Sequence, residues 1–153
     1  MLKKNIERIF ILSDAQKGIL YQHLAGASDI YTEIVCLKLA QWPDMEQLRI
    51  AWQRVVDNNQ ILRSYVQWER VSAPVLIMAC HKTVSIELKQ GSGDINRILQ
   101  EERTKGIQID QEAMRLVLYS IEDDGVYMLM ISHHIFLDGW STGIILDEWH
   151  RAF

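Results

Sequence analysis

The stretch VYMLMISHHIFLDGWS, residues 126–141, decides the fold of this chain of 153 residues. Its first part is almost continuously apolar and predicts a buried strand, Val126–Ser132. His133 and His134 follow where this strand ends, before a turn and the start of a helix. Because neighbouring residues of a strand point to opposite faces, only one of the two histidines can face a given site. The other must be buried, hydrogen-bonded or solvated.

The residues after the histidines predict a turn that leads into a final helix over 141–152. Gly139 permits a tight bend with a positive φ angle, because glycine has no Cβ. Ser141 is expected to cap the final helix, and Trp140 is expected to lie in the core. Asp138 has two interpretations, a helix cap or a part of a site. A strand end, a turn and a helix start together make a place where side chains can be held at the edge of a cleft.

The rest of the chain alternates between strand and helix patterns. Ser13 and Gln16 match a capping box, and Asp124-Gly125 between two apolar runs predicts a hairpin. Further strands are predicted at Ile6–Leu12, Tyr31–Leu39, Ile61–Trp68, Pro74–Cys80, Val84–Lys89 and Arg115–Ile121. Helices are predicted at 14–24, 44–56 and 94–105, the second with a core stripe of Met45, Leu48, Trp52, Val55 and Val56. We therefore expect an α/β (α+β) sandwich, a mixed sheet with helices packed on it.

Composition narrows the function classes. The chain has 16 basic and 20 acidic residues, a net charge of −4 and no basic patch, so we expect no nucleic-acid partner. Its apolar stretches are far shorter than the ~20 residues of a membrane span, and we expect no membrane association. Cys36 and Cys80 lack metal or redox spacing and are expected to be buried thiols in a reducing compartment, the cytoplasm. His133, His134 and Asp138 have no compelling fourth ligand, so no metal is expected.

The nine residues HHIFLDGWS, 133–141, resemble the HHxxxDG active-site motif of the condensation domains of nonribosomal peptide synthetases. Chloramphenicol acetyltransferase-like enzymes share this motif. Leu12–Tyr21 is similar to the family's opening motif and 59–64 to its second motif, in the same order and spacing. The second motif usually opens with Arg-His-Glu, where this chain has Asn58-Asn59-Gln60, but its later arginine is kept as Arg63.

The resemblance implies a role for each residue of the motif. His134 is implied to be the functional histidine, either as a general base or as a hydrogen-bonding and electrostatic aid to a tetrahedral intermediate. His133 would support it. Asp138 is implied to be structural through an ion pair with Arg63, and Gly139 to let the loop bend and keep the entrance clear. Outside the motif, Gln16 is expected to serve its helix cap first.

The resemblance also implies a larger assembly. Residues 1–153 match the N-terminal, chloramphenicol acetyltransferase-like lobe of a condensation domain, without its C-terminal lobe, so the isolated chain is expected to be inactive. Upstream and downstream peptidyl carrier proteins would present the substrates on 4'-phosphopantetheine arms, and no cofactor would bind directly. The first strand would help to dock an upstream synthetase. Apolar surface facing the missing lobe would favour self-association.

Three alternatives stay open. Epimerization domains share the His-His-Asp-Gly core of this motif. His133 and Asp138 also fit the His-x4-Asp pattern of glycerolipid acyltransferases, although these act at membranes and this chain is acidic. The third alternative is a docking or interaction module that keeps a vestigial site.

Overall fold

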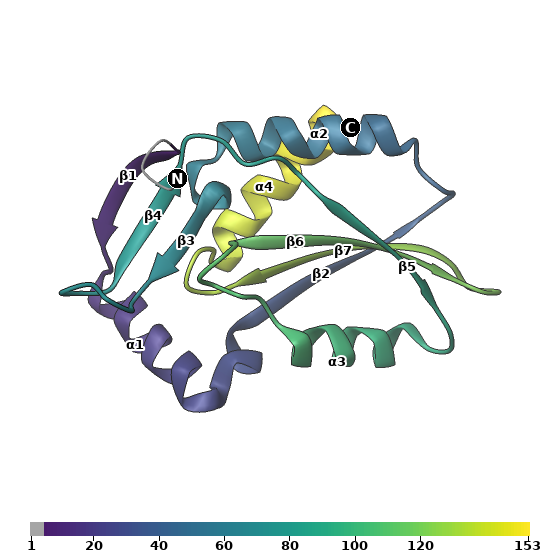
Figure 1. Ribbon diagram of the computed structural model, residues 1–153. Helices are drawn as coiled ribbons and strands as arrows, with labels where there is room; N and C mark the ends of the chain where they lie inside the picture. The colour runs from purple at the N-terminus through teal and green to yellow at the C-terminus, as the bar shows by residue number, and fades with distance from the viewer. Residues whose placement is uncertain (1–4) are drawn as a thin grey trace.

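Seven strands and four α-helices make up residues 5–153, the part of the chain that the computed structural model describes apart from the side chain of Ser28 (Figure 1). The strands are β1 (Ile6–Ile11), β2 (Thr32–Leu39), β3 (Ser64–Gln67), β4 (Val75–Ala79), β5 (Ile86–Gly91), β6 (Met114–Ile121) and β7 (Gly125–His133). The α-helices are α1 (Asp14–Gln22), α2 (Met45–Asn58), α3 (Ile95–Lys105) and α4 (Gly139–Ala152). Short helical turns are η2 (His23–Ala27), η3 (Ser28–Tyr31) and η4 (Gln60–Arg63).

The strands form two sheets. β2, β7, β6 and β5 lie in that order in a mixed sheet, in which β5 and β6 are parallel and the other pairs antiparallel. β1, β4 and β3 form a smaller antiparallel sheet. Helices α2 and α4 lie on one side of the larger sheet and α3 on the other (Figure 1). The predicted α/β sandwich with a mixed sheet is confirmed, although three of the strands form a sheet of their own.

The core lies between the larger sheet and α2. The predicted stripe of α2 is buried at Leu48, Trp52, Val55 and Val56. The Trp52 indole donates from Nε1 to Sδ of Met128 on β7, at 3.5 Å, and stacks on Trp149 of α4 with ring centroids 5.4 Å apart. Trp52 therefore joins both helices of this layer to the strand that carries the histidines.

The structure differs from the prediction at the segment 61–68. Only Ser64–Gln67 form a strand, because Gln60–Arg63 close a 3₁₀ turn directly after α2. Arg63 therefore sits at the end of a turn rather than inside a strand. The expectation of two buried thiols also fails, since Cys36 is half-buried and Cys80 is exposed.

The join between α2 and the larger sheet can be tested by truncating Trp52. Trp52→Ala leaves a cavity between α2, α4 and β7, so we expect a loss of about 3–5 kcal/mol in the free energy of unfolding, measured with urea. Ile50→Ala on the exposed side of the same helix is the control and should cost less than about 1 kcal/mol. Equal losses in the two variants would contradict this account of the core.

Candidate active site

The two histidines at the end of β7 leave the sheet in opposite directions. His133 is 0% exposed, whereas the side chain of His134 is 42% exposed. His133 pairs with Thr32 of β2, and the backbone N–H of His134 donates to the carbonyl of Tyr31 at 2.8 Å. The alternation expected from the sequence therefore holds, and His134 is the histidine that faces outward.

Both ring nitrogens of the buried His133 have partners. Nδ1 accepts a hydrogen bond from the backbone N–H of Ile135 at 3.2 Å. The neutral ring must therefore carry its proton on Nε2, which lies 3.1 Å from Nδ1 of His23. Burial, with smaller effects from the charges of His23 and His134, lowers the pKa of His133 to about 4. His133 is therefore a neutral structural group that shapes the turn after β7.

The turn itself is tied down by the backbone and by α1. The N–H groups of Phe136 and Leu137 donate to the carbonyl of His133, at 2.9 and 3.3 Å. Gln16 forms the predicted capping box with Ser13, and its Nε2 also donates to the carbonyl of Ile135 at 3.0 Å. The opening motif thus supports the turn directly, a contact that spacing alone does not reveal.

His134 has one side-chain partner, which no sequence motif singles out. Its Nδ1 lies 3.1 Å from Oε1 of Glu33 on β2, and both side chains are partly exposed. Within residues 5–153 no group forms a hydrogen bond with its Nε2. His134 therefore presents one ring nitrogen without a partner among the described residues, at the exposed end of β7.

The predicted ion pair between Asp138 and Arg63 is wrong. Asp138 is exposed and caps α4, accepting a hydrogen bond from the backbone N–H of Ser141 at 2.7 Å. This bond is the main cause of its lowered pKa, with a smaller contribution from the charge of His134. Ser141 is therefore not the cap but a residue of the first helical turn, whose N–H groups attract a carboxylate.

Arg63 is buried elsewhere, with a relative exposure of 6%. Its Nη1 donates to the carbonyls of Val56 and Asp57, at 2.8 and 2.6 Å, and its Nε to that of Ala79. Nη2 pairs with Oε2 of Glu7 on β1, at 3.2 Å. Arg63 is held away from Asp138 because the last carbonyls of α2 have no partners inside the helix and attract its guanidinium.

Two further expectations for the turn are corrected. Gly139 is the first residue of α4 and does not have a positive φ angle. A Cβ built there meets nothing within 4 Å, so neither backbone strain nor a close neighbour requires a glycine at this position. Trp140 is 82% exposed and not part of the core, whereas Trp149 of the same helix is buried.

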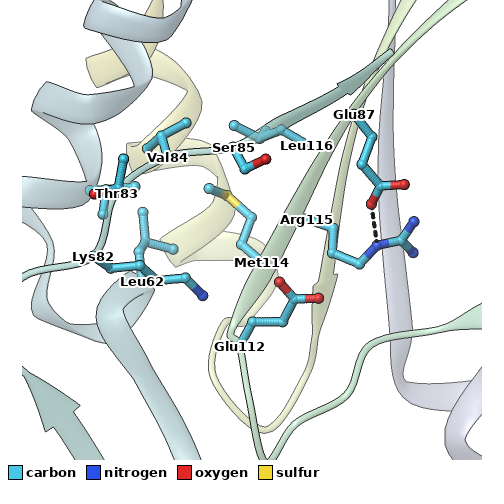
Figure 2. Close-up of a pocket in the computed structure, with 11 residues that line it drawn as sticks. Leu62, Lys82, Thr83, Val84, Ser85, Glu87, Glu112, Met114, Arg115 and Leu116 are labelled. Carbon is cyan, nitrogen blue, oxygen red and sulfur yellow. Dashed lines mark hydrogen bonds and ion pairs between the residues drawn. The ribbon is translucent and has the colours of Figure 1, made fainter. Parts of the chain in front are cut away.

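A cavity of about 140 Å³ lies elsewhere, between the β4–β5 segment and β6. Lys82 and Glu112 extend toward this space, and Arg115 pairs with Glu87 at its edge (Figure 2). Burial lowers the pKa of Lys82 and raises that of Glu112. None of the predicted site residues lines this cavity, so it is separate from the histidine site.

The described residues contain no cluster of His, Cys, Asp or Glu side chains arranged to hold a metal ion. No helix among them is both long and apolar enough to cross a bilayer.

Comparison with known proteins places the chain in a family. The family model described as the condensation domain matches residues 6–153. A linear gramicidin synthase from Brevibacillus parabrevis is 27% identical over 163 residues, covering 98% of this chain. Bacitracin synthase 1 of Bacillus licheniformis is 29% identical over 153 residues, covering 94%. This chain spans only 2% and 3% of these two relatives.

Solved structures show the same fold. The starter condensation domain of rhizomide synthetase has a TM-score of 0.80 at 16% identity, covering 96% of this chain and 39% of that one. A four-domain nonribosomal peptide synthetase bound to AMP and glycine has a TM-score of 0.83 at 17% identity, covering 97% of this chain and 12% of that one. The chain therefore belongs to the condensation-domain family, whose members sit within multidomain synthetases.

The neutral state of His133 predicts a pH dependence of stability. The pKa of the His133 ring is near its ordinary value of 6.5 in the unfolded chain and about 4 in the folded protein. Between pH 4 and 6.5 the unfolded state therefore binds more protons than the folded state. Stability is full above pH 6.5 and falls by about 3 kcal/mol as the pH drops to 4. In His133→Asn, whose new side chain cannot titrate, this loss of unfolding free energy between pH 6.5 and 4 should be absent.

His150, on the exposed side of α4, provides the control, and no ion pair joins it to another described residue. His150→Asn also removes a histidine but not the buried one, so it should not flatten the slope as His133→Asn does. Parallel curves for the wild type and His133→Asn would show that His133 is not held neutral by the fold.

The corrected contacts of Arg63 predict which residues are energetically coupled. In double-mutant cycles of unfolding, Arg63→Ala and Glu7→Ala should couple by about 1 kcal/mol, because their side chains touch. Arg63→Ala and Asp138→Ala should be additive within about 0.5 kcal/mol. Asp138→Ala alone should cost about 1 kcal/mol through the lost helix cap. Strong coupling between Arg63 and Asp138 would restore the ion pair that the structure contradicts.

Proposed function

We propose that this chain supplies the histidine of a site that joins an acyl thioester to an amine, with both groups presented by carrier proteins. The observation that carries this proposal is the free Nε2 of His134, held at the end of β7 in a chain of the condensation-domain family. An imidazole with an unpaired nitrogen near neutral pH can accept a proton or a hydrogen bond from an attacking amine.

The reaction needs little beyond positioning and one proton carrier. The amine nitrogen attacks the thioester carbonyl carbon and forms the C–N bond, while its proton passes to Nε2 of His134. Collapse of the tetrahedral intermediate breaks the C–S bond, and the departing thiolate takes the proton back. A positioned base raises the rate by about 10²–10⁴-fold, which lowers the barrier by about 3–5 kcal/mol. Holding two reactants together can lower the barrier by about 7–11 kcal/mol. Positioning therefore outweighs proton transfer.

Positioning on this scale requires more surface than one sheet edge offers. This chain covers 39% of the rhizomide starter condensation domain. We propose that residues 1–153 form the first lobe, that a second lobe closes the site, and that the chain alone is inactive. The exposed Trp140 and Ile144 on α4 support this arrangement, because they form apolar surface next to the histidine turn. Without a second lobe, this surface would favour self-association.

The proposal extends to substrates and location. Upstream and downstream peptidyl carrier proteins would bring the reacting groups on 4'-phosphopantetheine arms, so no cofactor needs to bind this chain directly. The proposed location is the cytoplasm, where reducing conditions keep thiols free. The exposed side of β1 is the proposed contact for an upstream synthetase, with Ile9 and Ile11 exposed there; residues 1–4 lie outside the described part.

The function is tested by combining the chain with the second lobe of a related condensation domain and with two loaded carrier proteins. We expect amide formation that falls by at least about 100-fold in His134→Ala, since the proton carrier is lost. His150→Ala, which changes a histidine at the far end of α4, is the control and should leave the rate unchanged. Product is measured by mass spectrometry of the carriers.

The same assay separates the alternatives. Exchange of the substrate's Cα proton for deuterium, without a new amide, would indicate an epimerization domain. Carrier binding without any turnover would indicate a docking module. Amide formation that survives His134→Ala would contradict the proposed role of this histidine.

A further inference from the structure

We propose that Glu33 is a positioning residue for His134, which it holds as the Nδ1-protonated tautomer so that Nε2 remains a proton acceptor. The meaning of this contact for catalysis rests on the proposed function. The tautomer itself rests only on the contacts of the two side chains.

The backbone brings Glu33 to the ring. In the antiparallel ladder of β2 and β7, Glu33 pairs with Ser132, two residues before His134. The chain leaves the ladder with the N–H of His134 donating to the carbonyl of Tyr31, two residues before Glu33. His134 is therefore anchored twice, through its ring to Glu33 of the edge strand β2 and through its backbone to Tyr31, the last residue of η3 directly before that strand.

The chemistry of the pair assigns the proton. An ionised carboxylate only accepts hydrogen bonds, so the Nδ1 atom 3.1 Å from Oε1 of Glu33 must donate. In the neutral ring Nε2 then has a lone pair, and no group within residues 5–153 occupies it. When Nε2 takes a proton, the same carboxylate faces the resulting imidazolium. Glu33 thus interacts favourably with the neutral ring protonated on Nδ1 and with the imidazolium, the two states between which a proton carrier alternates.

Glu33 has no competing partner in the part of the chain that the structure describes. Among the described residues no lysine or arginine pairs with Glu33, and His134 is its one ion-pair partner. Two other groups interact with His134 through charge alone: the neutral His133, and Asp138, whose carboxylate binds the N–H of Ser141 at the start of α4. Among the described residues Glu33 is therefore the one carboxylate that binds Nδ1 of His134.

The neighbouring histidine provides an internal reference. The N–H of Ile135 donates to Nδ1 of His133, so that ring carries its proton on Nε2. Two consecutive histidines are thus held in opposite tautomers, one by a backbone donor and the other by a carboxylate acceptor.

The tautomers can be read directly in the 153-residue chain. Long-range ¹H–¹⁵N spectra of the imidazoles at pH 8 should assign the proton to Nδ1 in His134 and to Nε2 in His133. In Glu33→Ala, His134 should shift toward a mixture of the two tautomers, and His133 should stay unchanged. Glu122→Gln, in the turn at the opposite end of β7, is the control that also removes one negative charge. A wild-type His134 protonated on Nε2 would overturn the proposal.

A variant that keeps the shape of Glu33 guards against misfolding. Glu33→Gln can both donate and accept, so it should give a mixture between those of the wild type and Glu33→Ala. Backbone amide spectra establish that each variant is folded. An unchanged His134 tautomer in both folded variants would also overturn the proposal.

The assay of the proposed function gives an independent measure. In the amide-formation assay Glu33→Ala should lower kcat by roughly 10- to 100-fold, which is a part of the contribution of His134. When His134 is already replaced by alanine, adding Glu33→Ala should lower kcat no further. If the tautomers are as expected but no amide forms, the function fails and the positioning role stands. If amide formation depends on His134 but the tautomer is independent of Glu33, the positioning role fails and the function stands.

Discussion

The buried imidazole of His133 is the constraint on which the site depends. A polar ring with no exposure must find a partner for each nitrogen, because an unpaired polar group inside a protein is costly. The ring obtains these partners by drawing the N–H of Ile135 back onto Nδ1 and by facing His23 with Nε2. The first bond forces the chain to turn immediately after β7. Because of this turn, the next side chain, His134, leaves the sheet and is partly exposed.

The support of this turn comes from the other end of the chain. Gln16 at the start of α1 binds the carbonyl of Ile135, and His23 at the end of the same helix binds His133. One short helix therefore fastens the turn at two points. The opening motif of the family accordingly has a physical meaning here, since its glutamine binds the backbone of the histidine turn.

Local patterns predicted what local physics decides, and failed where distant groups compete. Strand alternation is enough to infer that one of His133 and His134 is buried, and hydrophobic spacing is enough to place α2. The partner of Arg63 was not predictable in this way, because the end of α2 offers it unpaired carbonyls that no motif records. Glu33 was missed for a similar reason. Only the register of β2 against β7 brings it beside His134.

The placement of Asp138 completes the electrostatics of the open histidine. The N-terminus of α4 carries a partial positive charge and begins five residues after His134 in the chain. Asp138 binds the exposed N–H of Ser141 and offsets this charge without touching the imidazole. Glu33 then faces Nδ1 alone. Asp138 therefore offsets the helix dipole and Glu33 orients the His134 ring. Neither carboxylate needs an ion pair with Arg63.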